Sequence, residues 1–172
     1  SQRFIFVGCL NGDILYFYNN RWNKQSLINN ENIQNLFSVA RLKNKLALAT
    51  DNGLYYFYPD TPIEKHDFGK QGPVKGVCFE SIGGKEKLLV SGQTWFGYLE
   101  EGVYTEYTNK IVATFDPNSP FLNIIPDKRG GYFLGNEFTL IYYSVLENSL
   151  TPLGIINGLI SGGMNSVFVD SE

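Results

Sequence analysis

The sequence is poor in the residue types that most often carry chemistry in proteins. Among its 172 residues there are one histidine, two cysteines and one methionine. The two cysteines, Cys9 and Cys78, are too few for a disulfide-based fold, and each stands in or beside an apolar run, where a thiol acts as a small hydrophobic group. A catalytic thiol needs a nearby base, and His66 is the only histidine, so this composition disfavours cysteine-based catalysis.

Long apolar runs and an excess of basic charge are missing too. No stretch approaches the roughly 18 apolar residues that cross a bilayer, and no signal peptide is present in a chain that opens with Ser1. The 14 basic and 17 acidic residues are well mixed and give a net charge of −3, whereas a nucleic-acid surface needs a basic stripe. We expect no membrane contact and no nucleic-acid partner, and we interpret the chain as a piece of a longer protein.

The sequence also lacks the signatures of metal, nucleotide and catalytic sites. It holds no P-loop, dinucleotide fingerprint, EF-hand loop or nucleophile elbow. Glu64 and Asp67 flank His66 without a spacing typical of metal ligands, and we expect His66 to be a solvated surface residue. Asp116 and Glu137 would have to meet in space to act as a glycosidase acid pair, and nothing in the sequence brings them together. We predict no cofactor, no metal and no catalytic residue.

What the sequence does contain is a repeated β-hairpin. Two apolar runs in Leu46–Tyr58 surround Asp51-Asn52-Gly53, and Asn-Gly between such runs predicts a type I′ turn, which needs positive φ angles. The same unit stands earlier at Ile5–Tyr18, with Asn11 and Gly12 in its turn. The two turns lie 41 residues apart, and a repeat of that length is typical of β-propeller blades.

The period holds along the whole chain. Small residues that end one strand of each hairpin recur at intervals of 42, 42 and 43 residues, at Gly8, Thr50, Gly92 and Gly135. A further apolar run precedes each hairpin from the second repeat on, and a more polar run follows each of them. Four strands joined by short turns at this period describe a propeller blade. A β-sandwich would also have short strands, but it does not explain the fixed period.

Apolar residues occupy both faces of the strands, as expected for blades that are covered by neighbours on either side. The equivalent positions of the two clearest hairpins alternate alike, with Leu15, Tyr16, Phe17 and Tyr18 in the first and Tyr55, Tyr56, Phe57 and Tyr58 in the second. No segment has the apolar period of a helix.

We therefore predict an all-β fold, a single β-propeller domain over 1–172 with about four four-stranded antiparallel blades. The expected repeats are 1–28 (incomplete), 32–69, 73–109, 119–156 and 163–172 (first strand only). Two arrangements remain open at the ends. The last apolar run, Met164–Asp170, would complete the first blade by pairing with Phe4–Val7, or the chain would form an open arc whose uncovered edges and blade faces favour self-association.

With the repeats aligned, the chain resembles the two-component regulator propeller repeat family. The family pattern runs from Gly-Leu through a strand ending in Asp to a strand ending near Gly-Thr-Asn-Gly-Leu. The segments that match it are Asn157–Glu172, Pro126–Gly135 and Ala49–Tyr55 with Pro59 and Thr61. The chain departs from this pattern at two places. The Trp that usually opens the second strand is replaced by Phe4, Leu46, Leu88 or Tyr132. The last two hairpin turns lack Asn-Gly and have the sequences Gln93-Thr94-Trp95 and Asn136-Glu137-Phe138.

The resemblance implies an extracytoplasmic sensor. Propellers of this family lie outside the inner membrane in hybrid two-component histidine kinases of gut bacteria, ahead of a further β domain, a membrane span and a kinase. Many respond to glycan fragments, and dimerisation is part of their signalling. For this chain the resemblance implies a periplasmic location, an oligosaccharide as ligand, and self-association or contact with neighbouring blades.

The candidate ligand-binding residues are Trp95, Asn11, Asn52 and Asp51. Propellers bind ligands at the loops between second and third strands and between successive blades, and Trp95 stands in a loop of the first kind. Its ring would stack on a sugar, or it would pack under its own hairpin, which is the reading we favour. The other three residues would hydrogen-bond a polar ligand, although turn geometry also explains them. Asp127 and Asp170 are expected to cap turns, and Trp22 is expected to pack on its own sheet.

Three functions are compatible with these observations. The first is a non-catalytic sensor segment that binds a ligand. The second is a propeller scaffold for protein–protein contact or dimerisation without a ligand of its own. The third, a polysaccharide-active enzyme, would need a cluster of Tyr, His, Arg and acidic residues, and the single histidine disfavours it. The first two differ in whether Trp95, Asn11 and Asn52 share one cleft.

Overall fold

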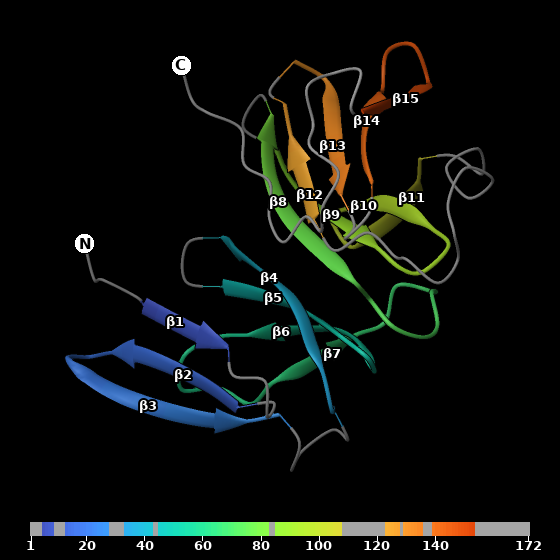
Figure 1. Cartoon of the computed structure of the whole chain (residues 1–172). Coiled ribbons are helices and arrows are strands. Elements are labelled where there is room, and N and C mark those ends of the chain that lie inside the picture. Colours follow the sequence, from blue (N-terminus) through green and yellow to red (C-terminus); the bar gives the residue numbers. More distant parts are fainter. Residues whose placement is uncertain are drawn as a thin grey trace.

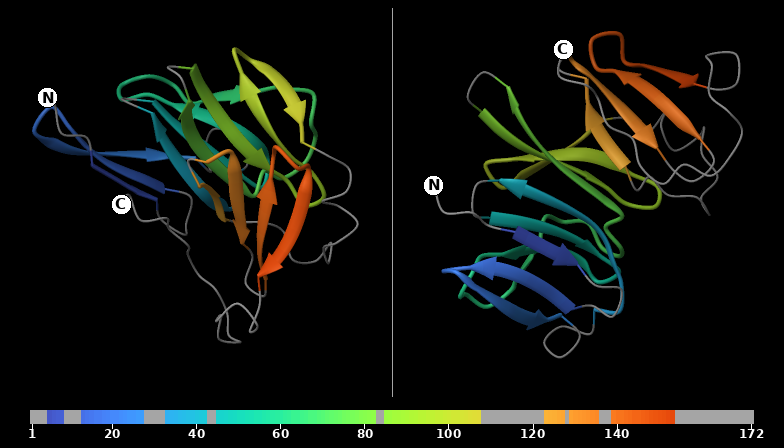
Figure 2. Two further views of the ribbon diagram at one scale, coloured as in Figure 1. Left: turned by 90° about the horizontal axis from the view of Figure 1, so that it is seen from above. Right: turned by 60° about the vertical axis from the view of Figure 1, so that its left-hand side comes forward.

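The computed structural model describes residues 5–8, 13–27, 33–42, 45–82, 85–107, 123–127, 129–135 and 139–153. These residues form strands and turns and no helix. The strands make four antiparallel sheets that lie in chain order, with the first sheet at one end of the row and the fourth at the other (Figures 1 and 2). The predicted all-β, propeller-like architecture is confirmed. Among the described residues, none belongs to a helix with the length and hydropathy of a membrane span.

Each sheet is a simple meander in which consecutive strands pair. The first sheet consists of β1 (Ile5–Gly8), β2 (Asp13–Tyr18) and β3 (Arg21–Ser26). The second consists of β4 (Leu36–Leu42), β5 (Lys45–Thr50), β6 (Gly53–Phe57) and β7 (Glu64–His66). The third consists of β8 (Gly76–Ile82), β9 (Lys85–Ser91), β10 (Phe96–Glu100) and β11 (Val103–Glu106). The fourth consists of β12 (Asn123–Pro126), β13 (Gly131–Gly135), β14 (Leu140–Ser144) and β15 (Ser149–Leu153).

Among the described residues, the first sheet has three strands and each of the others has four. Its strands correspond to the second, third and fourth strands of the later sheets, because the register that pairs Ile5 with Phe17 repeats as Leu46 with Phe57. The run Met164–Asp170, which would add a strand to this sheet in one of the two arrangements that the sequence leaves open, lies outside the described residues.

The core consists of three apolar clusters, each between two neighbouring sheets. Successive residues of β5 contribute to two different clusters. Leu46 and Leu48 belong to the cluster shared with the first sheet, whereas Ala47 and Ala49 belong to the cluster shared with the third. The third cluster joins the third and fourth sheets around Phe96. Strands covered on both sides must be apolar at successive positions, which explains the continuous apolar runs in the sequence.

The turn between β5 and β6 differs from the predicted type I′ turn. Neither Asp51 nor Asn52 has a positive φ; only Gly53 does, at 118°. The buried hydroxyl of Thr50 closes the turn instead, since it accepts a hydrogen bond from the Asn52 amide at 3.2 Å and donates one to the Gly53 carbonyl at 2.8 Å. Two consecutive positive φ angles occur between β2 and β3, at Asn19 and Asn20 (51° and 59°), where the type I′ geometry is met.

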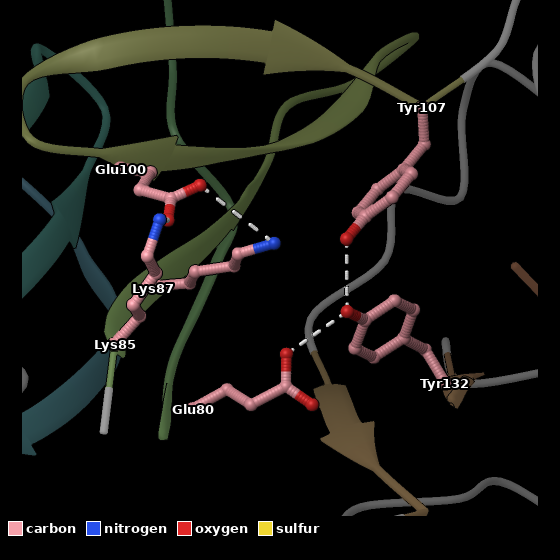
Figure 3. A network of polar contacts seen from close by, with 6 residues as sticks. All are labelled: Glu80, Lys85, Lys87, Glu100, Tyr107 and Tyr132. Atoms are coloured by element: carbon pink, nitrogen blue, oxygen red, sulfur yellow. Dashed lines mark hydrogen bonds and ion pairs between the residues drawn. The ribbon is translucent and has the colours of Figure 1, made fainter. Parts of the chain in front are cut away.

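A buried polar network joins the third and fourth sheets (Figure 3). Tyr132 of β13 donates a hydrogen bond to the Glu80 carboxylate of β8 at 2.9 Å, and its hydroxyl lies 2.8 Å from that of Tyr107. Glu80 is 8% exposed. Because a buried carboxylate needs hydrogen-bond donors, this contact fixes how the two sheets lie on each other.

Candidate functional site

A pocket of about 440 Å³ opens at one end of the second sheet. Its walls come from the turn before β6 and the start of that strand (residues 52–54), the end of β7 (residues 65–66) and the segment that leads to the third sheet (residues 67, 68 and 70–72). We call it the rim pocket. It therefore lies at the two kinds of loop that were expected to carry a ligand, the loop between second and third strands and the loop between successive blades.

The segment 67–72 is shaped by its own backbone chemistry. The Asp67 carboxylate accepts a hydrogen bond from the Gly69 amide at 2.9 Å, the arrangement of an Asx turn. Gly69 and Gly72 have φ angles of 79° and 89°, which residues with a side chain rarely adopt. The side chains between them, Lys70 and Gln71, line the rim pocket.

His66 lies in the wall of the rim pocket between two aromatic rings. Its ring centroid is 5.0 Å from that of Tyr56 and 6.3 Å from that of Phe68, which is nearly parallel to it. Burial lowers the pKa of His66, the charge of Lys45 lowers it further, and Asp67 opposes the shift. The expectation of a solvated surface histidine is wrong, because cross-strand pairing with Leu54 turns His66 toward the apolar junction with the third sheet.

Phe68 connects the rim pocket to an aromatic cluster of the third sheet. Its ring centroid lies 5.8 Å from that of Trp95 and 5.4 Å from that of Tyr104, and those two rings meet edge to face at 5.9 Å. The indole of Trp95 covers Gly92, where a Cβ atom would stand 2.1 Å from the ring. Glycine at position 92 is therefore what allows Trp95 to lie flat against its own hairpin.

Lysines and an amide supply the polar part of the rim pocket. Lys65 donates a hydrogen bond to the Asn52 side-chain oxygen at 3.1 Å, and the Asn52 amide nitrogen donates to the Tyr55 hydroxyl at 3.0 Å. Lys70 forms an ion pair with Glu106 of β11 at 2.6 Å. With Asp67 as the one acidic residue of the lining, the rim pocket offers mostly hydrogen-bond donors.

Two buried side-chain atoms in the described part of the chain have no hydrogen-bond partner, and both belong to residues that pack on Phe68. They are Nε2 of His66 and the hydroxyl of Tyr104. The pKa of Tyr104 is raised by burial and by the charge of Glu106. Buried polar groups are nearly always satisfied, so these two atoms are exceptions in the described part of the chain, and of the two residues only His66 lines the rim pocket.

The rim pocket brings together some of the predicted residues and not others. Asn52 lines it. Trp95 is not part of the lining and contacts the pocket only through the ring of Phe68. The carboxylate of Asp51 instead accepts the backbone amides of Gln34 and Asn35 at 3.1 Å and so caps the approach to β4. Asn11 lies outside the described residues.

The sequence did not single out Lys65, His66, Phe68 and Lys70 as a group. Lys65 and His66 point to opposite faces of β7, one paired with Tyr55 and the other with Leu54. The two side chains line one pocket because they lie at the end of the sheet, next to the segment 67–72. The one signal of this pocket in the sequence was the polar segment 67–72, which follows an outer strand and contains Gly69 and Gly72.

Several other predicted features can be placed. Asp127 caps its turn as predicted, accepting the amides of Arg129 and Gly131 at 2.7 and 2.8 Å. Cys78 is a free thiol whose pKa is raised to about 11 by burial and by Glu80. Trp22 contacts Phe17 edge to face at 5.5 Å but is 58% exposed, more than a packing role predicts.

The other residues considered as metal ligands or catalytic groups form no second site among the described residues. Among the described residues, no group of three or more His, Cys, Asp or Glu side chains could hold a metal ion. Cys9, Asp116, Glu137 and Asp170 lie outside those residues. The arrangement of the rim pocket, in which hydrogen-bond donors and an aromatic side chain line one cavity, suits the binding of a polar ligand.

Comparisons with known proteins establish the fold. No family model matches the chain, and no curated protein matches it. Its structure is similar to the extracellular domain of a proposed one component system from B. thetaiotaomicron, with a TM-score of 0.62 and 15% identity over 87% of this chain and 20% of that chain. A second structure of that domain, described as part of a proposed hybrid two component system, gives a TM-score of 0.61, 15% identity and the same coverage.

A chain of the Mitotic Checkpoint Complex is also similar, with a TM-score of 0.57 and 10% identity over 86% of this chain and 47% of that chain. The chain thus spans a fifth of the length of the bacterial structures that it matches. At these identities the similarity concerns the fold alone.

Proposed function

We propose that this chain is a non-catalytic, ligand-binding propeller segment of an extracytoplasmic sensor, and that its ligand is an oligosaccharide bound in the rim pocket. The assignment to the two-component regulator propeller repeat family, in the periplasmic part of a hybrid histidine kinase, belongs to the same proposal. The observation that carries it is the rim pocket itself, which is lined together by Lys65, Asn52, His66 and Phe68.

Two further observations support the proposal. Repeat-pattern residues such as Ala49–Tyr55 resemble a sensor family, and the similar bacterial structures are extracellular domains of signalling systems. The chemistry of the rim pocket also fits a saccharide, because sugars combine hydroxyl groups that accept and donate hydrogen bonds with an apolar ring face that packs on aromatic side chains.

A thermal-shift screen against a panel of oligosaccharides tests this function. A ligand that binds only the folded chain stabilises it by about 2.7 kcal/mol at a hundredfold excess over its dissociation constant. We expect a selective rise in melting temperature that is lost in Lys65→Ala, because Lys65 is an exposed pocket residue whose removal leaves the core intact. Lys85→Ala, an exposed lysine on the third sheet, is the matched control and should keep the shift.

The competing function is a scaffold that binds no ligand of its own. It gains weight if no oligosaccharide shifts the melting temperature, or if Lys65→Ala and Lys85→Ala lower the shift equally. A saccharide that is consumed during the assay would instead point to the enzyme that the single histidine disfavours.

A further inference from the structure

Lys65 is held at the rim pocket by groups that carry no charge. Its ammonium group donates a hydrogen bond to the side-chain oxygen of Asn52 at 3.1 Å and lies 5.8 Å from the ring centroid of Tyr55. The nitrogen of the Asn52 amide donates to the Tyr55 hydroxyl at 3.0 Å, which keeps the amide oxygen turned toward the lysine. Lys65 is therefore positioned without being neutralised.

The aliphatic part of Lys65 is positioned as well. A Cβ atom at position 53 would stand 3.4 Å from its Cε, so the lysine side chain lies against the backbone of Gly53. The residue is nonetheless exposed, and its ammonium group has two N–H donors beyond the one that bonds to Asn52. A donor that is fixed before binding loses little conformational freedom when a ligand arrives.

The equivalent positions in the two neighbouring sheets also carry charged residues, and both of those are paired. Lys24 of the first sheet and Glu106 of the third occupy the same place in the cross-strand register as Lys65. Lys24 forms an ion pair with Asp13 at 2.6 Å, and Glu106 forms one with Lys70 at 2.6 Å. Of the three equivalent residues, only Lys65 has no ion pair with a described residue.

One substitution between the repeats explains the difference. Asp13 is the first residue of β2 and Gly53 is the first residue of β6, and these two strands are equivalent in register. The aspartate of the first sheet neutralises Lys24. The glycine of the second sheet leaves the charge of Lys65 in place and lines the rim pocket itself.

The other ionisable groups of the rim pocket are engaged within the chain. Lys70 is paired with Glu106. The carboxylate of Asp67, the one acidic residue of the lining, accepts a backbone amide of its own loop. His66 is uncharged at neutral pH, because burial lowers its pKa. The charge that remains to pair with a ligand is the positive charge of Lys65.

We propose that the saccharide bound in the rim pocket is acidic, and that its carboxylate or sulfate group pairs with the ammonium group of Lys65. This inference rests on the proposed function, since it names the class of oligosaccharide that the pocket binds. A hydrogen bond between an ammonium group and an anion is about twice as strong as one between neutral groups. The rim pocket therefore favours a charged saccharide over its neutral counterpart.

Isothermal titration calorimetry with matched saccharides tests the proposal. The probes are disaccharides and trisaccharides of glucose, galactose and mannose, each in three forms in which C6 of one sugar carries a hydroxyl, a carboxylate or a sulfate ester. We expect a charged form to bind about tenfold more tightly than its hydroxyl form, or about 1.4 kcal/mol. This ratio should fall as the salt concentration rises, because salt screens an exposed charge. The two charged forms distinguish a carboxylate ligand from a sulfate ligand.

Two variants remove the positive charge in different ways. Lys65→Gln deletes it, whereas Asn52→Asp keeps the lysine and gives it a carboxylate partner of nearly the same shape as the amide. In both variants the affinity ratio between charged and hydroxyl forms should fall to about one. Lys24→Gln is the matched control, because Lys24 has the same place in the register and is paired with Asp13; it should keep the ratio. Circular dichroism checks that each variant is folded.

The outcomes separate this inference from the function on which it rests. If a hydroxyl form binds as tightly as its charged counterparts, the chain still binds saccharides and the acidic ligand is wrong. A preference for the charged form that persists in Lys65→Gln and Asn52→Asp, or that Lys24→Gln also removes, overturns the role of Lys65. Binding of none of these saccharides overturns the proposed function and this inference together.

Discussion

His66 has an environment that sets its charge. Its ring lies between Tyr56 and Phe68, where burial and the nearby charge of Lys45 both disfavour the imidazolium, while Asp67 favours it. The unfolded chain has no such environment. As the pH falls, the unfolded state therefore takes up a proton on His66 before the folded state does, and acid favours unfolding.

We expect an NMR titration of His66 to have a midpoint below the ordinary value of about 6.5. The stability that comes from burying the neutral ring is complete above that pH and is lost as the pH falls through the lower pKa of the folded state. His66→Phe keeps the aromatic stack without the titrating group, so its melting temperature should decline less on the acid side. A midpoint above the ordinary value would contradict this account.

At the scale of strands and sheets, one polar network decides how the third sheet meets the fourth. The carboxylate of Glu80 on β8 accepts a hydrogen bond from the hydroxyl of Tyr132 on β13 (Figure 3). Tyr107, the residue after β11, forms a hydrogen bond with the same Tyr132 hydroxyl. The pKa of Tyr107 is raised to about 12 by burial, although its bond to Tyr132 acts in the opposite direction. Burial and the contacts with Tyr107 and Glu80 raise the pKa of Tyr132 as well, so both tyrosines remain protonated donors at neutral pH.

Tyr132→Phe should destabilise the chain by about 1–3 kcal/mol, because it leaves the buried Glu80 carboxylate without this donor. Tyr104→Phe is the matched comparison, since the buried hydroxyl that it removes has no partner among the described residues. That variant should be neutral or stabilising. Urea unfolding of both variants measures the difference, and equal losses in the two would show that the network does not carry the stability assigned to it.

At the scale of the whole molecule, the described residues form a row of sheets in which each core cluster joins two neighbouring sheets. Such a molecule resembles a repeat protein, whose stability is close to a sum of local units and nearest-neighbour junctions. A weakened junction between the third and fourth sheets should therefore leave the first and second sheets protected.

Native-state hydrogen exchange measures this directly. In Tyr132→Phe we expect faster exchange of amides in β12–β15 and in β9 and β10, with unchanged rates in β5 and β6. Equal acceleration in all four sheets would show instead that the row unfolds as one cooperative unit.

Much of the fold could be predicted because its signals are local. The period between Gly8, Thr50 and Gly92, and apolar residues at successive positions of Leu46–Thr50, are enough to predict strands, hairpins and blades covered on both sides. The site could be predicted only in part. Asn52 could be predicted as a site residue because it occupies a turn. The predicted type of that turn was wrong, because hydrogen bonds of the buried Thr50 hydroxyl close the turn instead.

The sequence by itself determined the element order, the repeat and the burial of both strand faces, since these depend on residues close together along the chain. Only the tertiary structure decided what those elements place together. Glu80 and Tyr132 are 52 residues apart and bond only because two sheets pack, and Phe68 meets Trp95 and Tyr104 for the same reason. The physical cause is that polar partners and pocket walls are selected by packing between sheets, which leaves no periodic trace in the sequence.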